Sequence, residues 1–356
     1  MEIVVAGAGV IGLAVARELA GGGARVTVLE RCRAGRGATW AAAGILSPTD
    51  PHEWGGALGA FNAGAIATWP GWQAELAGET GLDTGFEQRG ELRVGPPGER
   101  FVAATRDGAR LAGWACEELD ADALRAAEPG LAADGLEGLR LPDTAGVRTD
   151  ALTAALLASC RARGVRLREG CAVTALERQA AVLAGGERVR FERFVLATGA
   201  WSSAWAGDLV RPVVRPVLGE SVVLRADGIC ALPVRSSRGS VVPARDGTYH
   251  VGTTVRELGF QDAPSVASVR RLLDNATRLF PALDDALLVG ARSGLRPMSA
   301  DGFPIMGPVD GGVVLATGHG REGIIHAPAT ARLIAAGILG GEWDAIPAAF
   351  RPSAER

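Results

Sequence analysis

The residues best placed to do chemistry lie near the N-terminus, where Gly7, Gly9 and Gly12 recur in the spacing G-x-G-x-x-G. Gly7 permits a tight turn, Gly9 lets the backbone approach a pyrophosphate at the positive end of a helix, and Gly12 lets that helix pack close to a strand. Glu30 follows about 20 residues later, where an acidic side chain can accept hydrogen bonds from both hydroxyls of an adenosine ribose. These residues predict a dinucleotide site, for either FAD or NAD.

The elements around this turn have the right order to position it. Residues 2–6 and 25–30 are short β-branched runs, and residues 7–20 between them have helical spacing, so they predict a β-α-β unit. Further strands of a parallel sheet are predicted at 165–168, 194–198 and 313–317, and the last two are apolar runs that glycine follows directly. Residues 328–340 are expected to form a closing helix with Pro328 in its first turn.

Two stretches of different character interrupt this sheet. Residues 85–145 and 213–292 contain alternating apolar and polar segments, which are typical of antiparallel strands. We therefore expect an α/β plus antiparallel β fold, in which a Rossmann-like nucleotide-binding domain is interleaved with a β-rich substrate domain. The first domain comprises residues 1–84, 146–212 and 293–356, and the second comprises residues 85–145 and 213–292.

The composition excludes several other kinds of chemistry. All 37 basic side chains are arginine, so enzymes that need a lysine ammonium, such as Schiff-base, pyridoxal phosphate and P-loop enzymes, are excluded. The five cysteines form no C-x-x-C pair and the four histidines are scattered, so we expect neither a disulfide framework nor a metal site. His52, His250 and His326 are expected to be structural or surface residues.

The net charge and the distribution of apolar residues also bear on binding partners and cellular location. A net charge of −3 and a pI near 5.9 give no basic excess for nucleic acid or an anionic membrane. The acidic second residue, Glu2, does not fit a signal peptide, and no uncharged apolar run reaches about 18 residues, as a transmembrane helix would. We expect a cytoplasmic protein with neither a nucleic-acid nor a membrane partner.

A run of small residues at 38–45 suits a backbone that passes very close to a flat ligand. With this run, the chain resembles the glycine oxidase and D-amino-acid oxidase flavoproteins. The likeness spans nearly the whole chain in family order and is nearest to the glycine oxidase branch. It rests on residues 7–12, 30–31, 38–45, 197–202, 294–297 with 301–304, and 318–328.

The resemblance implies FAD as cofactor, a two-lobed fold and a homo-oligomer. Covalent relatives attach the flavin through a cysteine aligned with 294–296; this chain has none there, so we expect non-covalent FAD. The helix start at 320–325 would lie at the flavin carbonyl end, where its dipole stabilises negative charge. Besides the three glycines, the implied FAD-binding residues are Val10, Ile11, Glu30, Arg31, Ala38, Thr39, Ala42, Ala43, Gly44, Ile45, Val173, Ala197, Gly199, Trp201, Arg296, His319, Gly320, Arg321, Glu322, Gly323, Ile324 and Ile325.

Two arginines are the expected catalytic and substrate-binding residues. The resemblance assigns Arg296 to the substrate carboxylate and Arg321 to the border of the same pocket, and a guanidinium offers a carboxylate a planar fork. Ser240, Thr254 and Ile45 are expected to complete the pocket. With the carboxylate held, the substrate Cα–H can point at flavin N5, and a neutral amine drives hydride departure without a side-chain base. The imine then hydrolyses to glyoxylate or another 2-oxo acid plus an amine, and O2 becomes H2O2.

Ser240 marks a departure from the family pattern. It aligns with the pocket tyrosine of glycine oxidase, and the only tyrosine in the chain is Tyr249. A smaller residue leaves space, so we predict that the substrate is an N-substituted glycine or another secondary amino acid. The lysine with which sarcosine oxidases activate oxygen is also absent, which leaves oxidase and dehydrogenase activity open.

Several alternatives share parts of this pattern. The enzyme could oxidise glycine itself for thiazole (thiamine) synthesis, or act as a D-amino-acid oxidase or dehydrogenase. A flavin domain that modifies tRNA would need a basic face, which the net charge disfavours. A non-enzymatic flavin-binding protein would not need Arg296 and Arg321. An NAD-dependent dehydrogenase would lack the yellow colour of a flavoprotein.

Overall fold

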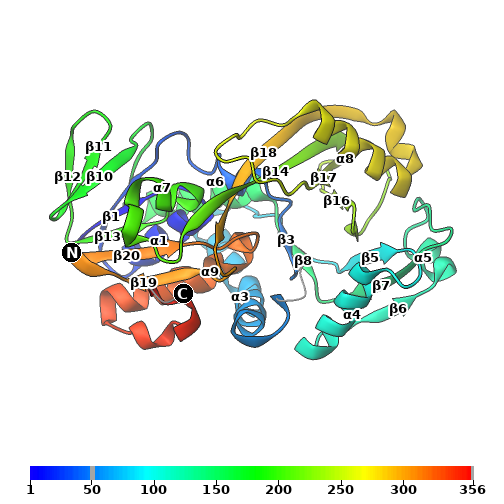
Figure 1. The fold of residues 1–356 in the computed structure, drawn as a ribbon, viewed down its shortest axis with the longest axis horizontal. Helices are drawn as coiled ribbons and strands as arrows, with labels where there is room; N and C mark the ends of the chain where they lie inside the picture. The colour runs from blue at the N-terminus through cyan, green and yellow to red at the C-terminus, as the bar shows by residue number, and fades with distance from the viewer. Residues whose placement is uncertain (49–52, 354–356) are drawn as a thin grey trace.

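The computed structural model describes residues 1–48 and 53–353, which form two lobes (Figure 1). The N-terminal strand begins a six-stranded sheet of the first lobe, in the order β19-β20-β13-β1-β2-β9. All neighbours in this sheet are parallel except β19 and β20. The strands are β1 (Glu2–Ala6), β2 (Arg25–Leu29), β9 (Arg166–Arg168), β13 (Arg193–Leu196), β19 (Ile305–Pro308) and β20 (Val313–Thr317).

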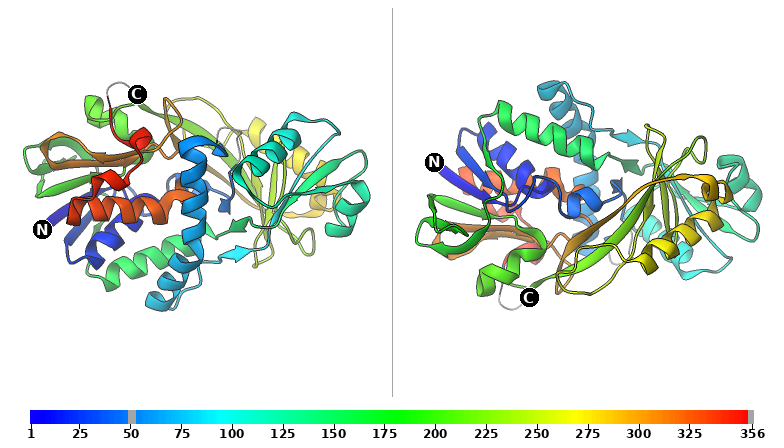
Figure 2. Two further views of the ribbon diagram at one scale, coloured as in Figure 1. Left: turned by 90° about the horizontal axis from the view of Figure 1, so that it is seen from below. Right: turned by 90° about the horizontal axis from the view of Figure 1, so that it is seen from above.

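This sheet is buried on both faces, which explains why its strands are continuous apolar runs. Ile3 and Val5 pack on one side against helices, and Val4 and Ala6 pack on the other against a small three-stranded sheet. The helices are α1 (Val10–Gly21), α3 (Gly56–Thr80), α6 (Thr149–Ala162) and α9 (Gly323–Gly340), and α3 lies across α9 (Figure 2). The small sheet contains β10 (Val173–Glu177), β11 (Ala180–Leu183) and β12 (Arg188–Arg190), with α7 (Ser202–Ala206) beside it.

The second lobe is built on an eight-stranded sheet in the order β18-β14-β17-β16-β15-β5-β7-β6. Only β15 and β5 pair in parallel, and the other neighbours are antiparallel. The strands are β5 (Glu91–Gly95), β6 (Glu117–Leu119), β7 (Glu137–Leu141), β14 (Val214–Arg225), β15 (Val234–Ser236), β16 (Gly239–Pro243), β17 (Thr248–Gly252) and β18 (Leu287–Ser299).

The two faces of this sheet differ in chemistry because side chains alternate along each strand. One face, with Leu92, Val222 and Val241, packs with Leu272 and Ala276 of α8 (Val266–Leu279) into an apolar core. The opposite face, which includes the row Arg93, Arg235 and Ser240 across three neighbouring strands, is polar. The lobe is completed by α4 (Arg100–Ala112) and α5 (Ala121–Ala127).

Short elements join the lobes. A three-stranded sheet in the order β3-β8-β4 contains β3 (Ile45–Leu46), β8 (Ala145–Gly146) and β4 (Glu87–Gln88), and α2 (Ala38–Ala41) packs on β18. The mixed α/β and antiparallel β fold predicted from the sequence is confirmed. The division into residues 1–84, 146–212 and 293–356 against 85–145 and 213–292 stays a proposal, which the membership of the strands in the two large sheets supports.

The closing helix differs from its prediction. It begins at Gly323, five residues before Pro328, so the proline lies inside α9 and the prediction of its start was wrong. The apolar residues Ile324, Ile325 and Ala327 are buried, and this burial extends the helix toward its N-terminus. Among the described helices, α9 is long and apolar enough to cross a membrane, but 61% of it is buried inside the protein, as in a core helix.

Candidate active site

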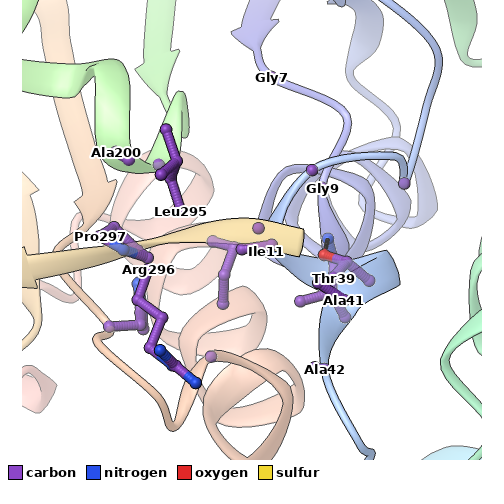
Figure 3. A pocket seen from close by; sticks show the side chains of 18 of the residues that line it. Gly7, Gly9, Ile11, Thr39, Ala41, Ala42, Ala200, Leu295, Arg296 and Pro297 are labelled. Carbon is purple, nitrogen blue, oxygen red and sulfur yellow. Dashed lines mark hydrogen bonds between the residues drawn. The ribbon is translucent and has the colours of Figure 1, made fainter. Parts of the chain in front are cut away.

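A cavity of about 580 Å³ lies between the two lobes. Figure 3 shows Gly7, Gly9, Thr39, Ala41 and Ala42 on one side of it, with Leu295, Arg296 and Pro297 opposite. The cavity runs from the ends of β1 and β2 to the polar face of the eight-stranded sheet, where it is lined by Arg235, Ser240 and Thr253. This position at the carboxyl ends of parallel strands is where nucleotide-binding sheets hold their ligands.

The glycines at the first turn are required by close contacts. Gly7 has a φ of +101°, and a Cβ there would lie 2.4 Å from the Ala197 carbonyl oxygen. A Cβ on Gly12 would lie 1.9 Å from the Gly7 carbonyl oxygen, so helix α1 packs directly onto the turn. A Cβ on Gly9 would meet only Thr39 Oγ1, at 3.5 Å, on the cavity side. Gly9 therefore leaves a cradle at the N-terminus of α1, as a pyrophosphate needs.

Glu30 is fixed at the end of β2. Its Oε2 accepts a hydrogen bond from the Ala8 amide at 2.8 Å, and its Oε1 accepts one from the Cys32 amide at 2.9 Å. Each carboxylate oxygen has a second lone pair with which it can accept a ribose hydroxyl. Beside it, the Arg31 guanidinium lies 3.4 Å from the centre of the Trp201 ring, and both residues line the cavity. This end of the cavity fits an adenosine.

The small-residue run at 38–45 has a steric explanation. Helix α2 packs against β18 so closely that a Cβ on Gly294 would lie 2.8 Å from Ala41 Cβ and 3.0 Å from Ala38 Cα. Thr39 Oγ1 accepts a hydrogen bond from the Val10 amide at 3.0 Å, which ties α2 to the start of α1. Larger side chains in this run would separate the two lobes along the cavity.

A glycine-rich loop between β20 and α9 forms the other wall. Gly318 and Gly320 have φ values of +72° and +55°, and the Gly320 amide donates to the Pro297 carbonyl oxygen at 3.0 Å. This hydrogen bond ties the loop that carries Arg321 to the residue that follows Arg296. The N-terminus of α9 therefore lies at the cavity wall, where its dipole can stabilise negative charge.

Arg296 is held on the polar face of β18. Its guanidinium donates to the Thr254 carbonyl oxygen and to Thr253 Oγ1, both at 3.0 Å. Gly219 of β14 pairs with Gly294, and a Cβ on Gly219 would lie 2.5 Å from the Arg296 guanidinium. Burial lowers the pKa of Arg296 to about 10, although nearby Glu322 opposes the shift. The side chain is still cationic at neutral pH and suits a carboxylate ligand.

Arg321 and Glu322 border the same end of the cavity. Arg321 is exposed because it faces the open space, while the surrounding protein lowers its pKa. Glu322 is buried, and burial together with Glu53 raises its pKa well above the usual range. This shift favours the neutral form of Glu322.

Most of the residues predicted from the sequence line this one cavity, and three do not. Gly12 lies beneath the turn, and Ile325 is a core residue whose carbonyl oxygen accepts a hydrogen bond from Trp69. The Thr254 hydroxyl is turned to the opposite face of the sheet, where it donates to Glu220 at 2.7 Å. The lining residues among those predicted are Gly7, Gly9, Val10, Ile11, Glu30, Arg31, Ala38, Thr39, Ala42, Ala43, Gly44, Ile45, Val173, Ala197, Gly199, Trp201, Ser240, Arg296, His319, Gly320, Arg321, Glu322, Gly323 and Ile324.

Sequence reasoning missed three lining residues at the substrate end. Thr253 replaces its neighbour Thr254 as the hydroxyl that faces the cavity, and Ser47 and Arg235 also line it. In the sequence, these residues are distinguished only by their position in or next to a strand in which apolar and polar residues alternate. Among the described residues, no group of three histidine, cysteine, aspartate or glutamate side chains is placed to hold a metal ion.

The described histidines have lowered pKa values; His319 and His326 are buried, and His250 is partly buried. His319 Nε2 lies 3.0 Å from Thr330 Oγ1, and His326 Nε2 lies 2.6 Å from Asn62 Oδ1. Burial lowers the pKa of His319 to about 3 and that of His250 to about 4, and it lowers the pKa of His326 well below its usual value. His52 lies outside the described residues.

These shifts predict an acid-sensitive stability. Below pH 6.5 these histidines bind protons in the unfolded chain but stay neutral in the folded protein. The stability that they contribute is therefore complete above pH 6.5 and is lost as the pH falls. Each histidine contributes a slope of up to about 1.4 kcal/mol per pH unit between pH 6.5 and 5. Urea unfolding at a series of pH values measures this slope, and His250→Asn should reduce it by roughly a third. A free energy of unfolding that is constant between pH 7 and 5 would contradict the expectation.

The cavity fits FAD on its own geometry. It has a glycine cradle at a helix N-terminus, an anchored carboxylate beside a flat Arg–Trp pair, and a second helix N-terminus at its far wall. Small residues pass along its middle, where a flat ring system needs space. Glu30 with Arg31 would hold the adenosine, Gly9 and Thr39 the pyrophosphate, and residues 320–324 the flavin.

Comparisons with known proteins agree with this geometry. Residues 2–336 match the family DAO, described as FAD dependent oxidoreductase. A glycine oxidase of Pseudomonas aeruginosa (strain PAO1) is 34% identical over 368 residues, which cover 99% of this chain and 98% of that protein. The bifunctional protein ThiO/ThiG of Nostoc sp. (strain PCC 7120) is also 34% identical, over 99% of this chain but 55% of its own length.

The fold comparison points the same way. The crystal structure of glycine oxidase from Geobacillus kaustophilus superposes with a TM-score of 0.91 at 28% identity, over 99% of this chain and 98% of that one. The resemblance inferred from the sequence motifs is confirmed, as is FAD as cofactor, and the partners are a small-molecule substrate and O2. The chain belongs to the DAO family of FAD-dependent oxidoreductases and is an FAD-dependent amino-acid oxidase.

Proposed function

We propose that the enzyme oxidises N-substituted glycines in preference to glycine. The observation that carries this proposal is the small side chain of Ser240 at the substrate end of the cavity. Its Oγ donates to the Gly252 carbonyl oxygen at 3.2 Å, so it is turned toward the neighbouring strand. The chain's only tyrosine, Tyr249, lies in the apolar core on the other face of the sheet, and its hydroxyl accepts a hydrogen bond from Ile229.

The residues at the substrate end of the cavity would bind the substrate and orient it. Arg296, held by Thr253 and Thr254, would bind the substrate carboxylate, and Arg321 would close the pocket from the loop before α9. With the carboxylate fixed, the Cα–H points along the cavity and the amine substituent extends toward Ser240. The substrate amine must be neutral to release a hydride, and the neutral state of His319 adds no positive charge beside it. FAD, when bound, supplies the acceptor for that hydride.

The overall reaction balances without a protein base. A secondary amine R–NH–CH2–CO2⁻ reacts with O2 and water and gives R–NH2, glyoxylate and H2O2. The Cα–N bond is oxidised to an imine and then hydrolysed, and O2 receives the two electrons and two protons. The membership in the family and the small side chain of Ser240 at the cavity support this reaction. The second candidate, oxidation of glycine itself, is supported by the likeness to the glycine oxidase of Pseudomonas aeruginosa.

Steady-state kinetics with glycine, sarcosine and N-ethylglycine would test the proposal. We expect the wild type to have a kcat/KM for N-ethylglycine at least about 10-fold above that for glycine. Ser240→Tyr should lower activity on N-ethylglycine by about 10-fold or more and change that on glycine by less than about 3-fold, because loss of space affects only the substituent. Ser240→Ala keeps the space and should behave as the wild type. Faster turnover of glycine than of any N-alkylglycine would contradict the proposal.

We also propose a cytoplasmic, homo-oligomeric enzyme. The likeness to glycine oxidases supports both properties. Light scattering during size-exclusion chromatography would measure the assembly, and a monomer at micromolar concentration would contradict it.

A further inference from the structure

A third arginine lines the substrate end of the cavity. Arg235 of β15 lies in the same cavity wall as Ser240, Arg296 and Arg321, and its side chain is only 11% exposed. In the proposed function, the single carboxylate of an amino acid binds the guanidinium of Arg296, and Arg321 closes the pocket. Arg235 therefore places a third, partly buried guanidinium beyond Ser240, in addition to the two that border the first carboxylate.

The strand register places Arg235 across the pocket from Arg296. Arg235 pairs with Ser240 on the neighbouring strand, and Ser240 pairs with Gly252 on the next one. Paired residues point to the same face, so Arg235 and Ser240 both face the cavity. Thr253 follows Gly252 and accepts the hydrogen bond from Arg296. Because neighbouring strands lie about 4.8 Å apart, β15 and β17 are about 10 Å apart, with Ser240 between them.

Arg235 is held in position by a buried carboxylate. Its guanidinium lies 3.4 Å from Glu91 Oε2, and Glu91 is fully buried. Burial alone would raise the pKa of Glu91, but Arg93 and Arg235 outweigh it and hold that pKa below the usual value. Arg93 also donates to Glu91 Oε1 at 2.8 Å, so two guanidinium groups share this carboxylate. The arrangement fixes the orientation of Arg235 before any ligand arrives.

The acidic groups at this end are few. Glu322 lines the cavity, and burial together with nearby Glu53 raises its pKa well above the usual range, which favours its neutral form. Glu91 is occupied by its two arginines.

We propose that Arg235 binds a second carboxylate, carried by the N-substituent, and that the enzyme therefore prefers N-(carboxyalkyl)glycines. This inference rests on the proposed oxidation of N-substituted glycines and names the chemistry of the substituent. Arg296 would hold the carboxylate next to the oxidised Cα, and Arg235 would hold the distal one past Ser240. For N-(carboxymethyl)glycine, the balanced reaction with O2 and water yields glycine, glyoxylate and H2O2.

Binding of unreactive analogues tests the inference without turnover. Diglycolate has an ether oxygen in place of the amine and two carboxylates, and methoxyacetate is the matched compound with one. Calorimetric titration of the FAD-loaded enzyme should show diglycolate binding at least about 10-fold more tightly. Arg235→Gln should remove this difference, and Arg235→Lys should restore part of it because it keeps the charge. Equal affinities in the wild type would overturn the inference.

A second arginine on the same hairpin provides the control. Arg238 is exposed and outside the cavity, so Arg238→Gln makes the same change in charge and should leave both affinities unchanged. In turnover, Arg235→Gln should lower kcat/KM for N-(carboxymethyl)glycine by about 10- to 100-fold and that for sarcosine by less than about 3-fold. Equal losses for both substrates, with normal flavin content and thermal stability, would assign Arg235 a merely structural or general electrostatic role and overturn the inference.

The outcomes separate this inference from the proposed function. Rapid oxidation of sarcosine and N-ethylglycine, with no advantage for the dicarboxylate, would uphold the proposed function and reject the role of Arg235. Tight diglycolate binding that depends on Arg235, in an enzyme that oxidises glycine faster than N-alkylglycines, would uphold the dicarboxylate site and reject the preference for alkyl substituents.

Discussion

Replacing Arg296 with methionine should lower kcat/KM for the preferred substrate by about 10²- to 10⁴-fold, because two charge-assisted hydrogen bonds to the substrate carboxylate are lost. The guanidinium is fixed by Thr253 and Thr254 at 3.0 Å each, so its geometry is set before the substrate binds. Methionine has a similar length and no charge, and Gly219 leaves room for it. Stopped-flow reduction and steady-state assays would measure the loss, while the visible absorbance should show that FAD is retained.

A matched variant on the adjacent strand controls for the loss of charge. Arg215 of β14 is exposed, so Arg215→Met should leave kcat/KM within about 2-fold of the wild type. Arg296→Lys should recover only part of the activity, because an ammonium cannot offer a planar fork. A loss of less than about 5-fold in Arg296→Met would contradict the assignment of the carboxylate to this side chain.

Gly12→Ala should abolish FAD binding and lower the free energy of unfolding by about 1–3 kcal/mol. Alanine is the better helix former by about 1 kcal/mol, which taken alone would stabilise α1. The new Cβ would lie 1.9 Å from the Gly7 carbonyl oxygen, so the helix must move away from the turn that would cradle the pyrophosphate. Flavin content after purification and urea unfolding would measure the two effects.

Another helical glycine provides the control for this substitution. Gly64 lies in α3, and nothing is within 4 Å of the Cβ that alanine would add. Gly64→Ala should therefore keep FAD and raise the free energy of unfolding by about 0.5–1 kcal/mol. Normal flavin content in Gly12→Ala would contradict the role given to the close packing of α1 on the first turn.

Local patterns in the sequence predicted the dinucleotide end because each of its parts is contiguous. Gly7, Gly9 and Gly12 lie in one turn, and Glu30 ends the next strand of the same β-α-β unit. Arg296 and Arg321 could also be predicted from the sequence, because each lies in a glycine-containing motif of the family. The parallel strands were recognisable as apolar runs because both faces of their sheet are buried.

The substrate end depends on register and was less accessible. Thr253 and Thr254 are adjacent, and a difference of one residue decides which hydroxyl faces the cavity and which faces Glu220. Arg235 reaches the pocket only because β15 pairs with β5 and β16, which lie in different stretches of the chain. No local pattern distinguishes it from the many other arginines. The set of side chains that line the substrate end therefore depends on strand pairing, which only the three-dimensional structure shows.

The most direct test of the central claim is the anaerobic bleaching of the bound flavin by a panel of amino acids in a stopped-flow instrument. The panel would contain glycine, sarcosine, N-ethylglycine, N-(carboxymethyl)glycine, D-alanine and D-proline. We predict rapid bleaching by the N-substituted glycines and a rate constant for glycine at least about 10-fold lower, because the space beside Ser240 favours a substituted amine. Bleaching by glycine or D-alanine that is faster than by every N-substituted glycine would contradict the account.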